Sequence, residues 1–257
     1  MNPLEIYKLL PKTNCGECPS KTCMSLAVQV KVSPDSLGEC GHINPENRSR
    51  IEAMVVKGDW REELVKSLAQ EASALRFEEI ADSLGGHMDG GSLTVRCIGV
   101  DYTITPGGTI SPDRGNAWIK ILLLHYIRSG GKGGFTGKWI SFSEFKGGLV
   151  KASSFAREAE ELLRELFDED PAAIVGMMRR LGGTAVNGYE EAQAWSIDLL
   201  PKVRTLVLYR PGDAEFPSSS LNILFDALTG NFLDVESIVF LCEGLTHTLR
   251  RMAKDPP

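Results

Sequence analysis

The sequence has no long hydrophobic run and no excess of positive charge. No apolar stretch in the 257 residues approaches the roughly 20 residues that a membrane-spanning helix needs. The net charge at pH 7 is −6, so the chain lacks the basic excess that neutralises the phosphates of DNA or RNA. We therefore expect neither a membrane span nor a nucleic-acid partner.

We expect no secretion signal either. The first residues, MNPLEIYKLLPKTN, carry charges where a signal peptide would be apolar. Hydrophobic residues make up 42% of the chain and charged residues 24%, which is ordinary globular usage. We expect a folded, cytoplasmic protein, in which the six cysteines do not form a disulfide scaffold because thiols are kept reduced there.

The periodicity of apolar residues indicates a mixed α+β chain without internal repeats. We expect a small module over residues 1–58, followed by a larger mixed α+β domain over residues 59–257. Helices are predicted at about 60–82, 116–128, 153–167, 171–182, 189–199 and 234–253. Strands are predicted within 92–108, at 205–209, and as a pair formed by 222–228 and 231–233.

Four of the cysteines have the spacing of a metal centre, Cys15-x2-Cys18-x4-Cys23-x16-Cys40. Four thiolates suit either a tetrahedral zinc ion or an iron–sulfur cluster. A zinc ribbon is disfavoured because Cys40 is followed by Gly41 and His42 rather than by a second C-x2-C pair. Cys23 lies where a helix should begin, so a positive helix end would face the anionic centre. The pattern favours a cubane cluster, with zinc and unliganded thiols as the alternatives.

The segment 3–45, PLEIYKLLPKTNCGECPSKTCMSLAVQV with the later Cys40, resembles the N-terminal four-iron four-sulfur domain of the corrinoid iron–sulfur protein large subunit. It is also similar to the cluster domain of Rnf-type electron-transport subunits. The resemblance implies one [4Fe-4S] cluster with four ligands, Cys15, Cys18, Cys23 and Cys40. Pro19 stands where the corrinoid family usually has glycine, which implies a change in one backbone hydrogen bond to the cluster but not in ligation.

The remainder, from about residue 60 to 254, resembles the uncharacterised prokaryotic family of domain of unknown function 3786. The segments that carry this resemblance are WIKILLLHYI, TGKWISFSEFKGG, LYRPGDAEFPSSSLNILFD and the final helix. This resemblance implies that the domain shares the fold of that family, but it indicates no catalytic activity or ligand.

The glycine-rich segment 130–137 invites comparison with phosphate-binding loops, but it fails the tests. A P-loop needs glycine where Lys132 stands and Ser or Thr where Trp139 stands. We therefore expect an ordinary loop. Asp213, Glu215 and Asp226 lie near strand ends, where a pair of carboxylates could act as acid and base, although turn chemistry explains Asp213 equally well.

Three side chains of the larger domain could contact a flat cofactor such as a corrinoid or haem. His125 could be its lower ligand, and Trp139 and Phe142 could line its pocket. The alternative is that all three are core residues, since aromatic side chains mostly bury area and a histidine on an apolar helix face is mostly packed. Cys97 and Cys242 are expected to be small core hydrophobes.

These patterns favour an iron–sulfur protein that passes single low-potential electrons to a redox partner protein. The resemblance implies a corrinoid protein or related anaerobic one-carbon machinery as that partner. One alternative is an enzyme whose active site in the larger domain receives electrons from the cluster. Another is a non-redox interaction protein in which the metal only stabilises the fold. Whether the chain is an enzyme is left open.

Overall fold

The computed structural model describes residues 3–56, 60–113, 115–189, 192–214 and 217–254. The chain divides into two compact units, Met1–Leu64 and Val65–Pro257. The expected boundary between residues 58 and 59 lies outside the described residues. The chain is mixed α+β, as predicted. Every helix in the described part is too short or too polar to cross a lipid bilayer.

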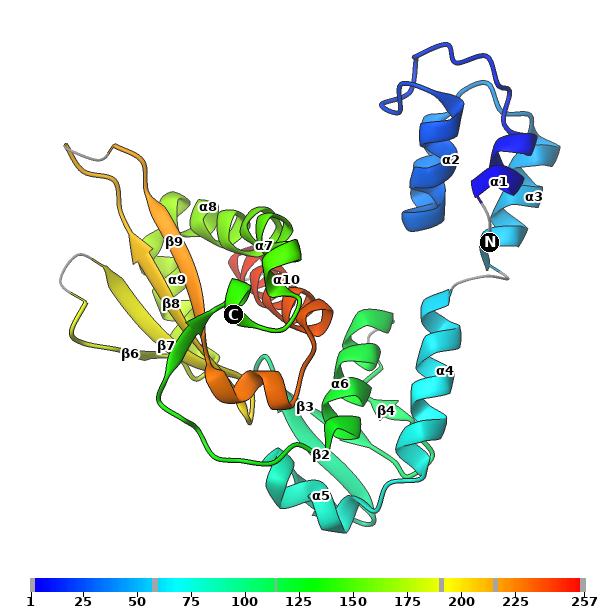
Figure 1. Cartoon of the computed structure of the whole chain (residues 1–257). Helices are drawn as coiled ribbons and strands as arrows, with labels where there is room; N and C mark the ends of the chain where they lie inside the picture. Colours follow the sequence, from blue (N-terminus) through cyan, green and yellow to red (C-terminus); the bar gives the residue numbers. More distant parts are fainter. Residues whose placement is uncertain (1–2, 57–59, 114, 190–191, 215–216, 255–257) are drawn as a thin grey trace. The chain divides into compact units, whose positions relative to one another are not determined.

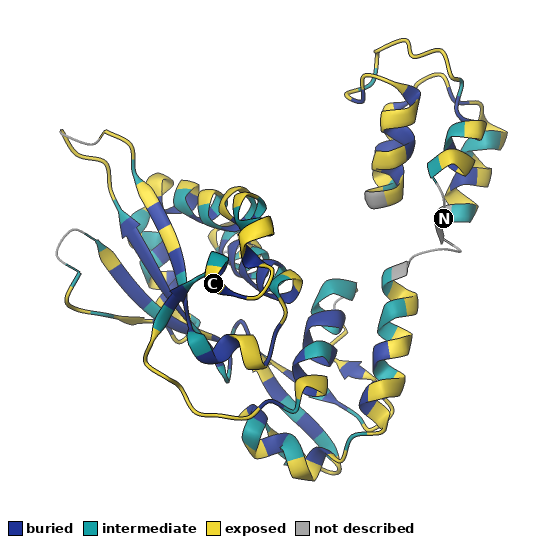
Figure 2. Cartoon of the chain, in the orientation of Figure 1, coloured by how far each residue is buried: buried dark blue, intermediate teal, exposed yellow. Residues whose placement is uncertain are grey.

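The N-terminal unit consists of short helices around a small apolar core (Figures 1 and 2). Its elements are α1 (Pro3–Leu9), α2 (Cys23–Val32), the 3-10 turn η1 (Pro34–Glu39), α3 (Pro45–Val56) and the start of α4 (Trp60–Ser73). Thr22 begins α2 by accepting a hydrogen bond from the Ser25 N–H at 3.1 Å. The fully buried core side chains come from three of these helices: Ile6, Leu26, Val30 and Ile51.

The C-terminal unit begins with the remainder of α4 and a small antiparallel sheet. The elements are α5 (Phe77–Leu84), β1 (His87–Asp89), β2 (Ser92–Cys97), β3 (Val100–Ile104), β4 (Ile110–Ser111) and α6 (Ala117–Ser129). The strand order is β1-β2-β3-β4, with Cys97 paired to Val100 at the β2–β3 turn. The fully buried Leu93, Ile104 and Leu122 contribute to the core of this region.

A second antiparallel sheet has the order β5-β9-β8-β7-β6. Its strands are β5 (Trp139–Ser141), β6 (Thr184–Ala185), β7 (Gln193–Leu200), β8 (Val203–Arg210) and β9 (Ser220–Asp226). The central strand β8 is buried on both faces, which explains its continuous apolar run. On one face Leu206 and Leu208 pack with Ala194 in a small cluster. On the other, Tyr209 stacks on Phe167 of α8 (Glu161–Glu169) with ring centres 4.9 Å apart.

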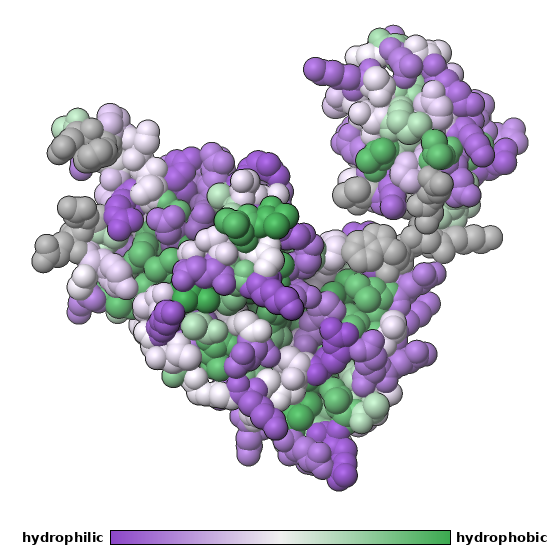
Figure 3. Space-filling view, viewed as in Figure 1, coloured by the Kyte–Doolittle hydropathy of each residue, from purple (hydrophilic) through white to green (hydrophobic). Residues whose placement is uncertain are grey.

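The remaining helices pack on one another and on the second of these faces (Figure 1). They are η2 (Phe142–Glu144), α7 (Gly148–Phe155), a π-helical segment η3 (Ala156–Glu160), α8 (Glu161–Glu169), α9 (Pro171–Arg180), η4 (Ala227–Asn231) and α10 (Val235–Lys254). Leu149 and Val150 on the first turn of α7 are largely exposed and form an apolar patch there (Figure 3).

Three expected elements were wrong. The helix predicted at 189–199 is strand β7, because pairing with β8 outweighs the local helical pattern. The helix predicted at 60–82 is interrupted between Ser73 and Phe77, which gives α4 and α5. The strand predicted at 231–233 does not form, since Asp226 caps the 3-10 turn η4 by accepting from the Leu228 N–H at 2.9 Å.

We expect Gly148→Ala to destabilise the C-terminal unit severely. A Cβ at this position would lie 2.0 Å from the backbone oxygen of Phe142, which no side-chain rotation relieves. The matched control is Gly176→Ala in the interior of α9, where a Cβ meets no atom within 4 Å. This control should stabilise the chain by about 0.5–1 kcal/mol because alanine favours a helix over glycine. Urea denaturation of both variants measures the difference, and equal midpoints would contradict the packing described.

Candidate metal centre

The cysteine loop joins α1 to α2 and is tightly curled. Three of its residues have left-handed backbone conformations: Lys12 at φ 62°, Asn14 at φ 48° and Gly16 at φ 75°. Glycine adopts this region freely and asparagine tolerates it. Every second residue from 12 to 16 is therefore left-handed, which bends the chain around Cys15.

Side-chain hydrogen bonds attach this loop to the start of α2. The Cys23 N–H donates to Asn14 Oδ1 at 2.8 Å, and Ser20 Oγ donates to Gln29 Oε1 at 2.6 Å. The Cys18 thiol donates to the Ser20 carbonyl at 3.0 Å. The loop therefore returns to the helix end that carries Cys23.

Three of the four predicted ligands share one packed cluster. Cys23 and Cys40 are buried in the core of the N-terminal unit, and the partly buried Cys18 packs against the same core. Cys23 is the first residue of α2, and Cys40 is the residue that ends η1. Cys15 is exposed. All six cysteines are free thiols, so the four remain available as soft ligands.

These residues fit an iron–sulfur centre by their chemistry. Thiols that reach one core from a loop, a helix start and a turn provide the all-sulfur donor set that such clusters use. The N-terminus of α2 adds partial positive charge beside Cys23, which suits an anionic centre. Arg48 donates to the Cys40 carbonyl at 3.3 Å and so helps to fix the fourth segment.

A second donor group lies on the exposed side of the loop. The ligand atoms of Cys15, Glu17 and His42 all lie within 4.8 Å of one another. His42 Nε2 and Glu17 Oε2 are 2.7 Å apart. Both side chains are exposed, and no signal in the sequence pointed to Glu17. This trio offers the mixed sulfur, oxygen and nitrogen donors that a single zinc ion accepts.

The two remaining cysteines are core residues, as expected. Cys97 is 2% exposed and Cys242 is 1% exposed. Burial raises the pKa of the Cys97 thiol to about 12 and raises the pKa of Cys242 as well. Both thiols are therefore neutral at physiological pH and are poor nucleophiles.

The structure does not bring the three proposed flat-cofactor residues to one cavity within its described part. Phe142 is buried and stacks on Phe155 with ring centres 4.2 Å apart. Trp139 packs on the opposite sheet face beside Leu206. Of the three, His125 alone lines the cavity of about 330 Å³ that includes Phe232. Packing thus accounts for Phe142, while a cofactor role of His125 and Trp139 stays a prediction.

His125 lies near a serine and an aspartate without forming a catalytic relay. Its Nδ1 is 3.1 Å from Ser237 Oγ and 3.7 Å from Asp234 Oδ2. A relay needs the hydroxyl and the carboxylate on different ring nitrogens, and here both lie nearest to Nδ1. Burial lowers the pKa of His125, with the nearby Asp234 opposing that shift. These contacts place His125 beside the start of α10.

The glycine-rich segment 130–137 is an irregular loop, and two of its backbone N–H groups donate to a carboxylate of the protein itself. Buried Asp226 accepts hydrogen bonds from the N–H groups of Thr136, Gly137 and Leu228, and from the Thr136 hydroxyl. Burial alone would raise the pKa of Asp226, but these hydrogen bonds hold it below its ordinary value. Asp226 therefore anchors the loop rather than acting as an acid or base. Glu215 lies outside the described residues.

Two family models match separate segments of the chain. A family model described as "Putative Fe-S cluster" matches residues 10–42, which include all four cysteines. The large subunit of the corrinoid/iron-sulfur protein from Moorella thermoacetica is 42% identical over 50 residues, which are 20% of this chain and 11% of that protein.

Two further relatives are subunits of acetyl-CoA decarbonylase/synthase complexes. The gamma subunit of the acetyl-CoA decarbonylase/synthase complex from Methanothermobacter thermautotrophicus is 33% identical over 52 residues, covering 20% of this chain and 11% of the subunit. The Archaeoglobus fulgidus gamma subunit is 59% identical over 29 residues, covering 11% and 6%. The chain thus spans about a tenth or less of the length of these curated relatives. No solved structure matches it significantly.

The larger part of the chain matches a different family model. That model is described as domain of unknown function DUF3786, and it covers residues 76–248, well over half of the sequence. The match contains both sheets of the C-terminal unit and most of its helices. The chain therefore belongs to the DUF3786 family, and it carries at its N-terminal end an iron–sulfur domain similar to that of the corrinoid/iron-sulfur protein large subunit.

Proposed function

We propose that the four cysteines Cys15, Cys18, Cys23 and Cys40 hold one [4Fe-4S] cluster through which the chain passes single electrons to a partner protein. The observation that carries this proposal is the packing of Cys18, Cys23 and Cys40 on one small core. The match of an iron–sulfur family model to residues 10–42 supports the same centre. When bound, the cluster supplies reversible one-electron chemistry.

The protein's own groups divide the centre into a buried and an exposed side. Leu26 and Leu37 lie in the core cluster that holds Cys23 and Cys40 and exclude water from that side. The exposed Cys15 leaves the opposite side accessible. The dipole of α2 lowers the energy of added negative charge near Cys23. Electrons would therefore enter and leave on the Cys15 side.

The partner we propose is a corrinoid protein or a related component of anaerobic one-carbon metabolism. Support comes from the names of the relatives, which are subunits of a corrinoid/iron-sulfur protein and of acetyl-CoA decarbonylase/synthase complexes. The similarity ends within the first quarter of the chain, so docking would use surfaces specific to this protein. Our proposed role is reductive activation of the partner's corrinoid.

Anaerobically purified full-length protein tests the electron-transfer function. We expect a brown protein whose visible absorption bleaches with dithionite, returns on reoxidation, and takes up about one electron per chain. After reduction it should also reduce an added corrinoid/iron-sulfur protein, whereas a sample that has not been reduced should not. Irreversible bleaching, or a colourless preparation that holds zinc, would contradict the electron-transfer role.

One alternative has an observation of its own. The trio Cys15, Glu17 and His42 could hold a zinc ion that stabilises the loop without redox chemistry. This site would use only one of the four cysteines. A Glu17→Gln variant should lose bound metal under this alternative and should keep its iron under the cluster proposal.

A further inference from the structure

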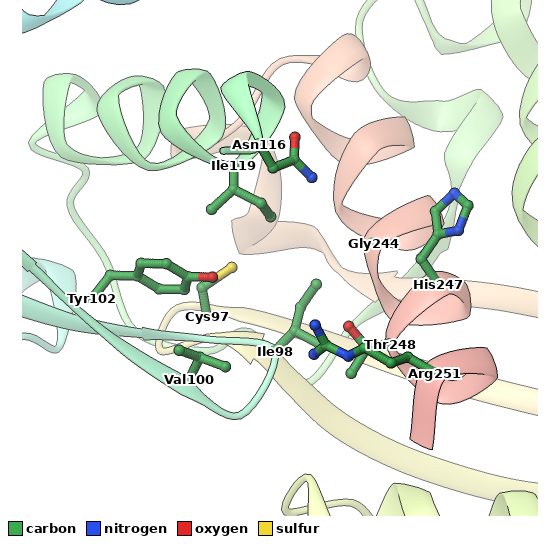
Figure 4. A pocket seen from close by; sticks show the side chains of 10 residues that line it. All are labelled: Cys97, Ile98, Val100, Tyr102, Asn116, Ile119, Gly244, His247, Thr248 and Arg251. Atoms are coloured by element: carbon green, nitrogen blue, oxygen red, sulfur yellow. The ribbon is translucent and has the colours of Figure 1, made fainter. Parts of the chain in front are cut away.

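A groove in the C-terminal unit has an apolar floor and a cationic rim (Figure 4). It lies between the β2–β3 turn, the start of α6 and the last turns of α10, and has a volume of about 420 Å³. This size is within the range of small-molecule sites. Ile98, Val100 and Ile119 supply apolar surface, and His247 and Arg251 lie on the α10 side.

The charge of the groove is unbalanced. Among the described residues that line it, none has an acidic side chain. His247 and Arg251 are four residues apart and therefore share one face of α10. Within the described part of the chain, neither side chain forms a hydrogen bond or an ion pair. The neighbouring Arg250, in contrast, lies 3.6 Å from the Glu165 carboxylate.

The floor of the groove is held in a strained conformation. Ile98 has φ 45°, although a β-branched residue strongly disfavours the left-handed region. It is 5% exposed, and its N–H donates to the Leu199 carbonyl at 2.9 Å. Gly244 of α10 leaves space for it, since a Cβ there would lie only 3.0 Å from Ile98 Cδ1. The β2–β3 turn and α10 therefore pack closely against each other at this groove.

We propose that this groove binds a small organic carboxylate. The carboxylate group is held by the Arg251 guanidinium, and the apolar body of the ligand lies against Ile98, Val100 and Ile119. Arg251 extends from α10 toward Ile98, so a cation and apolar surface meet at one place (Figure 4). Asn116 at the rim accepts from the Trp118 N–H through Oδ1, which leaves its amide N–H groups as donors.

Arginine is suited to this role because its planar guanidinium can bind both oxygens of a carboxylate. Inorganic phosphate would supply a counter-charge to Arg251, but it would leave the apolar floor exposed to water. A neutral alcohol would cover the floor but leave Arg251 without a counter-charge. Only a ligand with both an anionic group and an apolar body uses the whole groove. The groove residues lie in the C-terminal unit, so the proposal does not depend on the metal centre.

Isothermal titration of the full-length protein with hexanoate tests the proposal. We expect saturable binding of hexanoate that is tighter than that of acetate, inorganic phosphate or hexanol. Arg251→Gln should weaken hexanoate binding about tenfold or more, as expected for a lost charge-assisted hydrogen bond. The matched control Arg250→Gln removes the same charge one residue earlier and should bind like the parent chain.

Isoleucine-methyl NMR provides a second measurement, in which hexanoate should shift the signals of Ile98 and Ile119. Circular dichroism checks that both arginine variants are folded. Three results would overturn the proposal: no saturable binding of hexanoate, equal weakening by both arginine substitutions, or phosphate binding as tight as hexanoate binding. None of these results depends on whether iron is bound.

Discussion

Replacing Cys23 by alanine should abolish iron binding and unfold much of the N-terminal unit. Cys23 belongs both to the proposed ligand set and to the core formed with Leu26 and Ile51. Metal centres in small domains contribute on the order of 10 kcal/mol to folding, and a unit of this size buries too little apolar surface to replace that. Iron analysis and far-ultraviolet circular dichroism measure the two effects.

The matched control for this substitution is Cys242→Ala. Cys242 is buried, like Cys23, with 1% of its surface exposed against 7%, but it lies in α10, outside the four-cysteine spacing. Removing its sulfur leaves a small cavity, which costs about 1 kcal/mol, and the iron content should stay unchanged. A Cys23→Ala protein with parental iron and helicity would show that Cys23 is no ligand.

Replacing Asp226 by alanine should destabilise the C-terminal unit by about 3–5 kcal/mol. The substitution leaves three backbone N–H groups and the Thr136 hydroxyl without their acceptor in a buried site. Unsatisfied buried donors cost about 1–3 kcal/mol each, and partial relaxation reduces their sum. The control Asp198→Ala removes a half-exposed partner of Arg204 and should cost less than about 1 kcal/mol. Urea denaturation of both variants measures their free energies of unfolding, and an equal loss in the two would contradict the role given to the buried carboxylate.

Asp226 also predicts how stability changes with pH. Because its pKa is lower in the folded than in the unfolded chain, its ionisation stabilises the folded state. That contribution is fully present above the ordinary aspartate pKa of about 4 and is lost as the pH falls through the lowered folded-state pKa. Asp226→Asn should remove this part of the acid dependence. Parallel stability curves for parent and variant between neutral and acidic pH would contradict the assignment.

Local signals in the sequence predicted the start of α2 and the irregular glycine loop correctly. Thr22 provides the side-chain cap of α2, and glycine density alone excluded regular structure at 130–137. The segment 193–200 was misjudged because its apolar residues also fit a helical period, and only its partner strand β8 settles its conformation. Such long-range pairing is invisible in a local pattern.

Contacts between side chains that are far apart in the sequence could not be predicted either. The contact of Glu17 with His42 spans 25 positions, and that of Thr136 with Asp226 spans 90. The groove at Arg251 depends on three segments that meet only after folding. The cysteine spacing, in contrast, is local enough to be recognised, and its proposed ligand set awaits metal analysis.

Iron and acid-labile sulfide analysis of oxygen-free, full-length protein shows whether the four cysteines hold a cubane cluster. We expect about four iron and four sulfide ions per chain, with zinc absent. One zinc ion per chain without sulfide, or protein free of both metals that keeps α1 to α3 folded, would contradict it.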